Sequence, residues 1–187
     1  GRYIKVPLDA YEIDLEGAHI YPGFIDGWFE VKKDEKTISP DDHWNNKIKA
    51  NYRAKDDLKI KEKDLKALRA LGLTAVHIIP EEGIFKGKSD LVMLDKDFKS
   101  YKKDVAQIID FKTTGWSDRS YPNSLLGVMA LIRQTLMDAD WYYNSTQIVT
   151  KYSEQNPLIP FHPSLSELSD FRLNRKPILF VTKEEHG

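Results

Sequence analysis

Residues 17–31 read Gly-Ala-His-Ile-Tyr-Pro-Gly-Phe-Ile-Asp-Gly-Trp-Phe-Glu-Val, and the rest of the predicted fold is organised around them. Their central Pro-Gly pair turns the chain, and the residues that follow have the composition of a β-strand. Alternate side chains of a strand share a face, so one face is predicted to carry Asp26, Trp28 and Glu30. The opposite face is apolar, and we expect it to pack against a layer of helices. Its members are Ile25, Phe29 and Val31.

Chemistry in parallel α/β folds gathers at the carboxyl ends of the strands. Asp26 and Glu30 lie toward that end of the predicted strand, which makes them candidate catalytic residues. Trp28 is a candidate ligand-binding residue, because an indole offers a flat stacking surface. His77, near the carboxyl end of a second buried strand, is a further catalytic candidate, although a lone His in an apolar strand is more often a satisfied core residue.

Helices that alternate with buried strands indicate an α/β fold. A leucine-rich helix over residues 64–71 is stopped by Gly72, and the β-branched run 74–79 forms the next strand. This order is the return half of a βαβ unit, in which the two strands are parallel. Further strands are predicted at residues 105–111 and 177–182. Residues 80–95 contain Gly83 and Gly87, which permit tight turns, and the run Asp90–Leu94. A phosphate loop is rejected there because the glycine spacing differs and no helix pattern follows.

The strongest helix pattern covers residues 122–143, and Pro122 is acceptable in the first turn of a helix. Apolar residues recur at helical spacing, and the remaining side is also largely apolar. We therefore expect this helix to be buried on more than one side. Arg133 on this helix is a candidate ligand-binding residue, although such arginines more often pair locally.

The composition describes a soluble chain that is long enough for a real core. Its 187 residues carry 28 Lys and Arg against 29 Asp and Glu, a net charge of −1, which favours neither nucleic acid nor an anionic membrane. No apolar run is long enough to span a bilayer. The absence of cysteine excludes disulfides and thiol catalysis and is compatible with any compartment. The compartment stays open, since a signal peptide removed before Gly1 would make the protein secreted or periplasmic.

Candidate metal ligands are scattered. The five His lie at positions 19, 43, 77, 162 and 186, and no pair has the spacing of a local metal motif. His43 follows Asp41 and Asp42, where a solvated loop is favoured over a metal cluster. His77 and Glu30 would meet across neighbouring strands, but two ligands fall short of the roughly three that zinc needs. We therefore predict no metal site.

Residues 15–26, Leu-Glu-Gly-Ala-His-Ile-Tyr-Pro-Gly-Phe-Ile-Asp, resemble the start of the catalytic barrel in the amidohydrolase superfamily, in particular its imidazolonepropionase-like branch. Residues 68–76, 83–92 and 121–134 are similar to the same branch. Members of that family read Pro-Gly-Phe-Ile-Asp-x-His-x-His at the first motif, and the two His bind metal. In this chain the two positions are Trp28 and Glu30, so the scaffold motif is present and the metal motif is not.

Together these observations predict an α/β fold of mainly parallel β/α units that resembles part of a TIM-type amidohydrolase barrel. Residues 1–17 would form an N-terminal arm or the remnant of a β-sandwich, and residues 18–187 a partial barrel-like domain. A full barrel has eight strands and about 250 residues. We therefore expect the chain to form homo-oligomers or to join the remainder of a larger barrel, because open sheet edges invite pairing.

Two hypotheses of function follow. The first is an amidohydrolase-like protein that lacks the metal, needs no cofactor, and acts as a binding or structural module with an aromatic pocket, for instance for a carbohydrate. The alternative, implied by the resemblance, is a hydrolase of amide or cyclic amide bonds in a small-molecule substrate. It would use zinc or another divalent metal to polarise a carbonyl or activate water once the barrel is complete. Metal content distinguishes the two.

Overall fold

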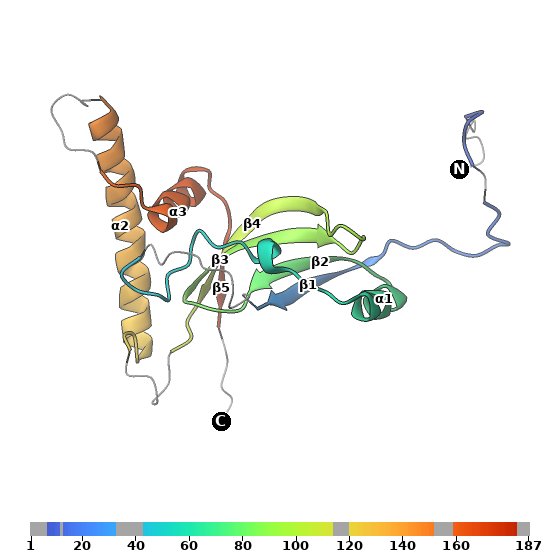
Figure 1. The fold of residues 1–187 in the computed structure, drawn as a ribbon, viewed down its shortest axis with the longest axis horizontal. Coiled ribbons are helices and arrows are strands. Elements are labelled where there is room, and N and C mark those ends of the chain that lie inside the picture. The colour runs from blue at the N-terminus through green and yellow to red at the C-terminus, as the bar shows by residue number, and fades with distance from the viewer. Residues whose placement is uncertain (1–6, 12, 33–42, 114–119, 152–158, 183–187) are drawn as a thin grey trace.

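A computed structural model describes residues 7–11, 13–32, 43–113, 120–151 and 159–182 of the chain. Within these residues a single sheet is combined with helices (Figure 1). The elements in chain order are β1 (Phe24–Val31), the 3-10 helix η1 (Ala54–Asp57), α1 (Glu62–Ala70), β2 (Leu73–Pro80), β3 (Phe85–Met93), β4 (Ser100–Asp110), α2 (Leu125–Lys151), α3 (Pro163–Leu173) and β5 (Ile178–Val181).

Four strands of the described sheet run in one direction and the fifth, β3, runs against them. The order in space is β1-β2-β3-β4-β5. The pairs β1–β2 and β4–β5 are parallel, whereas β3 is antiparallel to both β2 and β4. The predicted α/β fold with mainly parallel strands is therefore confirmed. The strands expected at 24–31, 74–79 and 177–182 lie parallel in one curled sheet, that of a half-barrel.

Strand β3 lies within residues 80–95, where the sequence pattern predicts no strand. Gly83 and Gly87 do have positive φ values of 103° and 115°, but the chain runs as a strand from Phe85 onward. The sequence of β3 alternates charged and small residues, and its charges are nevertheless buried by partners from other elements. Because β3 runs in reverse, its first residues reach the carboxyl ends of the other strands.

A loop between β1 and α1 fastens the start of β3. The Lys88 amide donates to the Tyr52 carbonyl at 2.8 Å, and a Cβ added to Gly87 would lie 2.4 Å from that same oxygen. This close approach of two backbones requires glycine at position 87.

The side chain of Tyr52 is fixed in the same loop. Its hydroxyl donates to Asp57 at 2.7 Å. Burial, and secondly the hydrogen bond to Asp57, raise the pKa of the Tyr52 phenol above its usual value.

The described helices pack on one face of the sheet. Leu65 of α1 is buried with Val76 and Ile78 of β2, and residues of α2 and α3 are buried with Ile109 of β4. The alternate residues of the strands form a separate cluster, to which these helices contribute nothing, as expected for the inner face of a half-barrel. The core of that inner cluster consists of Ile79, Ala106 and Ile108.

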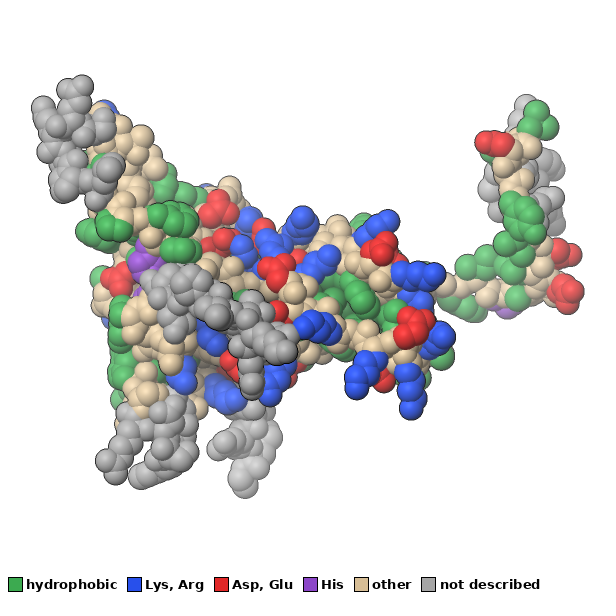
Figure 2. All heavy atoms as spheres, in the orientation of Figure 1, with side chains coloured by type: hydrophobic (Ala, Val, Ile, Leu, Met, Phe, Trp, Pro, Cys, Tyr) green, Lys and Arg blue, Asp and Glu red, His purple; other side chains and the backbone are tan. Residues whose placement is uncertain are grey.

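Helix α2 is longer than expected and less buried. It begins at Leu125, after Pro122, and extends to Lys151. One side of it is buried, but an apolar stripe on the other side is exposed, so the expectation of burial on more than one side is wrong for the described chain. Figure 2 shows hydrophobic side chains gathered over α2. The exposed apolar residues are Leu125, Leu126, Met129, Met137, Trp141 and Ile148.

The apolar face of β1 is confirmed in part. Phe29 and Val31 pack into the cluster that contains Leu65 of α1, but Ile25 is 60% exposed. Ahead of β1, the N-terminal arm extends away from the sheet, and its apolar side chains are exposed (Figure 1). The boundary at residue 17 stays a prediction. No helix among the described residues has the length and apolarity needed to cross a membrane.

Candidate functional site

A buried ion pair lies at the carboxyl ends of the parallel strands. The Lys86 ammonium, from the start of β3, is 2.9 Å from an oxygen of Asp110 at the end of β4. It is also 3.9 Å from an oxygen of Glu30, near the end of β1. The side chains of Lys86 and Asp110 are each 4% exposed, whereas that of Glu30 is 46% exposed. One ammonium therefore lies between two carboxylates at the place where barrels carry their chemistry.

A bulge brings Lys86 to this position. Phe85 is opposite Ile109, and Gly87 is opposite Ile108, so β3 has one extra residue, Lys86, between them. Such a bulge re-aims the side chain that it contains. The Lys86 side chain consequently reaches across to β1 and β4.

Trp28 and Glu30 share a face of β1, as predicted. The indole nitrogen of Trp28 donates to Glu30 at 3.3 Å, and the Trp28 residue is 40% exposed. Glu30 thus receives an indole N–H and lies beside the Lys86 ammonium. Both partners hold the Glu30 carboxylate at the rim of the inner face.

Asp26 does not share that face. The register of β1 against β2 shifts between Asp26 and Phe29, which lie opposite Val76 and Ile78. Because Val76 and Ile78 are two residues apart, they share a face, and Asp26 therefore lies on the side of Phe29 rather than on that of Glu30. An oxygen of Asp26 accepts the Trp28 amide at 2.9 Å. The strict alternation expected for β1 is broken here, and the Asp26 carboxylate accepts a backbone hydrogen bond within the irregular stretch.

His77 is held by both of its ring nitrogens. Nδ1 lies 3.1 Å from the Gly27 carbonyl, which only accepts, so Nδ1 donates to it. Nε2 lies 2.8 Å from the Ser89 hydroxyl oxygen, which also lies 3.2 Å from the Ala106 carbonyl. Ser89 is fully buried, and its oxygen accepts the Ala106 amide at 3.1 Å. The pair has the spacing of a nucleophile and its base, but a buried serine cannot meet a substrate. His77 thus joins β1 to β3, and among the described residues no hydrogen bond or ion pair joins it to Glu30. Its place among the catalytic candidates stays a prediction.

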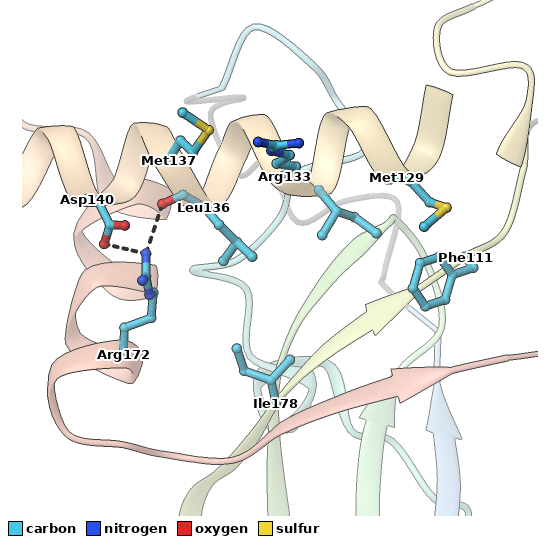
Figure 3. A pocket seen from close by; sticks show the side chains of 9 residues that line it. Phe111, Met129, Arg133, Leu136, Met137, Asp140, Arg172 and Ile178 are labelled. Carbon is cyan, nitrogen blue, oxygen red and sulfur yellow. Dashed lines mark hydrogen bonds and ion pairs between the residues drawn. The ribbon is translucent and has the colours of Figure 1, made fainter. Parts of the chain in front are cut away.

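Arg133 lies at a different place. It lines a pocket of about 430 Å³ between α2, α3 and β5, on the face of the sheet that the helices cover. Figure 3 shows Leu136 and Met129 pointing from α2 toward Phe111 and Ile178. At one end Arg172 forms an ion pair with Asp140 and donates to the Leu136 carbonyl at 3.2 Å. The ligand-binding candidates Trp28 and Arg133 therefore do not form one site.

His43 is buried in an aromatic cluster. Its ring centroid is 5.5 Å from that of Trp44 and 5.6 Å from that of His162, and its Nδ1 accepts the Asn45 amide at 3.1 Å. The solvated loop expected here is therefore wrong for His43. Asp41 and Asp42 lie outside the described residues.

The donor set at the carboxyl ends does not fit a metal ion. Within the described chain no group of three or more His, Asp and Glu side chains gathers as metal ligands would. The two carboxylates that do approach each other already share the Lys86 ammonium. Sequence reasoning missed Lys86 and Asp110. The signal for Asp110 was available, since it is an acidic residue at the carboxyl end of a buried strand.

Comparison with known proteins supports the fold. This chain is similar to the solved structure of an amidohydrolase from Thermotoga maritima MSB8, with a TM-score of 0.77 and 18% sequence identity over 99% of this chain. The similarity covers 51% of that protein, so this chain spans about half of its length. No family model matches the chain, and no curated protein matches it. At this identity the likeness shows an amidohydrolase-like fold, and the imidazolonepropionase-like branch stays a prediction.

Proposed function

We propose that this chain is an amidohydrolase-like half-barrel without the metal site of that superfamily, acting as a binding or structural module rather than as a hydrolase by itself. The observation that supports the proposal is the chemistry at the end of β1. Trp28 supplies an indole, which is not a metal ligand, and this indole donates to Glu30. The imidazole of His77, on the neighbouring strand β2, is engaged through both nitrogens by Gly27 and Ser89.

We further propose that the chain works as one part of a larger barrel. β5 is an edge strand of the described sheet, and the apolar stripe of α2 is exposed, with Met129 and Met137 lining a pocket together with Ile178 of β5. The chain also spans about half of its structural neighbour. These features favour one occupant, a run of β/α units that adds a parallel strand to β5 and a helix beside α2. In the same proposal, residues 1–17 are an arm or the remnant of a β-sandwich, and residues 18–187 are the part of the barrel.

Metal content and activity test the functional proposal together. Protein purified without chelators should contain far less than one zinc, iron or manganese per chain by elemental analysis. It should also show no metal-dependent hydrolysis of amide or cyclic amide substrates. Close to one metal per chain, lost in Glu30→Gln or His77→Ala but kept in the exposed control Glu62→Gln, would overturn the proposal and restore a metal-dependent hydrolase.

A further inference from the structure

The Lys86 ammonium is placed as a metal cation would be placed. It lies within ion-pair distance of carboxylates from two different strands, β1 and β4, at the carboxyl ends of the parallel strands. It arrives from a third strand through the bulge between Phe85 and Gly87. A single positive charge therefore ties together three strands at one end of the sheet.

This ammonium cannot share its place with a second cation. Asp110 is almost fully buried and has the Lys86 ammonium 2.9 Å from its carboxylate. A divalent ion bound by Glu30 and Asp110 would lie within a few ångströms of that ammonium, and like charges at such distances repel strongly away from bulk water. Moving the ammonium away would leave it buried without a partner, which is costly.

We propose that Lys86 is the built-in cation of this end of the half-barrel, holding Glu30 and Asp110 in place of a metal ion, and that removing its charge opens a divalent-cation site between the two carboxylates. The inference rests on the proposed function only in that both place no metal here in the native protein. It names Lys86 as the residue that keeps a metal ion out. It also predicts that a variant gains cation binding, which the proposed function by itself does not predict.

The test compares Mn²⁺ binding by the full chain and its variants, with Mn²⁺ alone as the probe. Electron paramagnetic resonance reports free Mn²⁺, and thermal melting reports stabilisation by bound ion. The native protein should bind no Mn²⁺ stoichiometrically. Lys86→Met should bind about one ion with a Kd of roughly 10⁻⁴–10⁻³ M, the range of weak carboxylate sites. Its melting temperature should rise with Mn²⁺, and Lys86→Met/Asp110→Asn should lose both effects.

A matched control removes a lysine from a single exposed carboxylate. Lys49 pairs with Glu82 at 3.1 Å, so Lys49→Met should gain no Mn²⁺ binding. A folded Lys86→Met that binds no more Mn²⁺ than Lys49→Met would overturn this inference and leave the proposed function standing. Stoichiometric Mn²⁺ bound by the native protein and lost in Glu30→Gln would overturn both.

The native protein gives a second measurement that does not depend on the folding of Lys86→Met. Nitrogen-15 spectra of the lysine ammonium groups should contain a slowly exchanging signal, assigned to Lys86 by its loss in Lys86→Arg. We expect one equivalent of Mn²⁺ to leave this signal sharp, because the ammonium excludes the ion. Selective paramagnetic broadening of that signal would contradict the proposal.

Discussion

The ammonium of Lys86 lies 2.9 Å from a carboxylate oxygen of Asp110, and both side chains are almost fully buried. The two residues come from the beginning of one strand and the end of the next, which antiparallel pairing brings to the same edge. Lys86 can reach Asp110 only because β3 is antiparallel to β4. In a parallel β3, the first residues would lie at the amino ends of the other strands.

Breaking this pair on one side should destabilise the fold strongly. Lys86→Met or Asp110→Leu should each lower the free energy of unfolding by about 3–5 kcal/mol. Lys86→Met leaves the buried Asp110 carboxylate without its ammonium, and Asp110→Leu leaves the buried ammonium with only the half-exposed Glu30 carboxylate, 3.9 Å away. The double variant should recover much of that loss, since no buried charge remains. Urea unfolding of the two single variants and the double variant measures the coupling. Additive losses in the double variant would show that the two residues act independently.

The buried hydroxyl of Ser89 should contribute to stability through His77. Ser89→Ala leaves Nε2 of His77 and the Ala106 amide without a hydrogen-bond partner, a loss of about 1–3 kcal/mol. Thr150→Ala removes an exposed hydroxyl, and it should change stability by less than about 0.5 kcal/mol. Thermal or urea unfolding checks both. Equal, small effects would mean that His77 is not held in the way described.

Glycine at position 87 should be irreplaceable. Gly87→Ala places a methyl group against the Tyr52 carbonyl and forces a residue with a side chain into a φ of 115°, which should cost about 1–3 kcal/mol or more. Gly27→Ala is the matched control, because nothing lies within 4 Å of its added Cβ. Unfolding curves should separate the two variants clearly. A Gly87→Ala protein as stable as Gly27→Ala would contradict the close approach of the loop to β3.

Tyr52 should make the protein sensitive to alkaline pH. Its phenol pKa is raised on folding, so the folded state keeps a proton that the unfolded state releases above about pH 10. The stability that this group contributes is therefore complete below pH 10 and is lost as the pH rises further, by up to about 1.4 kcal/mol per pH unit. Tyr52→Phe should flatten this dependence in urea unfolding between pH 9 and pH 11. Tyr101→Phe, which alters an exposed phenol, should leave it unchanged.

The exposed apolar stripe of α2 should cause the isolated chain to self-associate. Leu126→Lys/Met137→Lys places two charges on the stripe and should shift the protein toward monomer in sedimentation velocity at rising concentration. Glu62→Lys changes the net charge by the same two units at an exposed residue of α1, away from the stripe, and should have little effect. A native chain that stays monomeric at all concentrations and melts sharply would show that the described half-barrel is complete by itself.

The parts of the fold that the sequence predicts correctly are those whose pattern is local. β2 and β5 are apolar runs, β1 follows the Pro22-Gly23 pair, and Gly72 follows α1 with a φ of 84° as expected. β3 was missed because Lys86, Lys88 and Asp90 look like exposed residues. Their partners Asp110, Glu167 and Arg53 come from β4, from α3 and from the loop before η1, and no local pattern reveals them.

The candidate site was predictable to the same extent. Its location at the end of β1, and the shared face of Trp28 and Glu30, follow from strand alternation. The departure of Asp26 from that face follows from a register shift against β2, which depends on the partner strand. The hydrogen bonds of His77 likewise depend on β1 and β3, so the sequence could not identify its partners. It could predict only that a histidine in an apolar strand is usually hydrogen-bonded within the fold, and His77 is bonded in this way.

The reversed strand also has a consequence for the order of folding. β2, β3 and β4 follow one another through connections of residues 81–84 and 94–99, whereas residues 32–72 separate β1 from β2, and residues 111–177 separate β4 from β5. Short loops close at lower entropic cost, and local pairings form faster. The central meander should therefore form first and exchange its amide hydrogens most slowly. The edge strand β5, onto which any further strand would add, should be among the last parts of the sheet to become ordered.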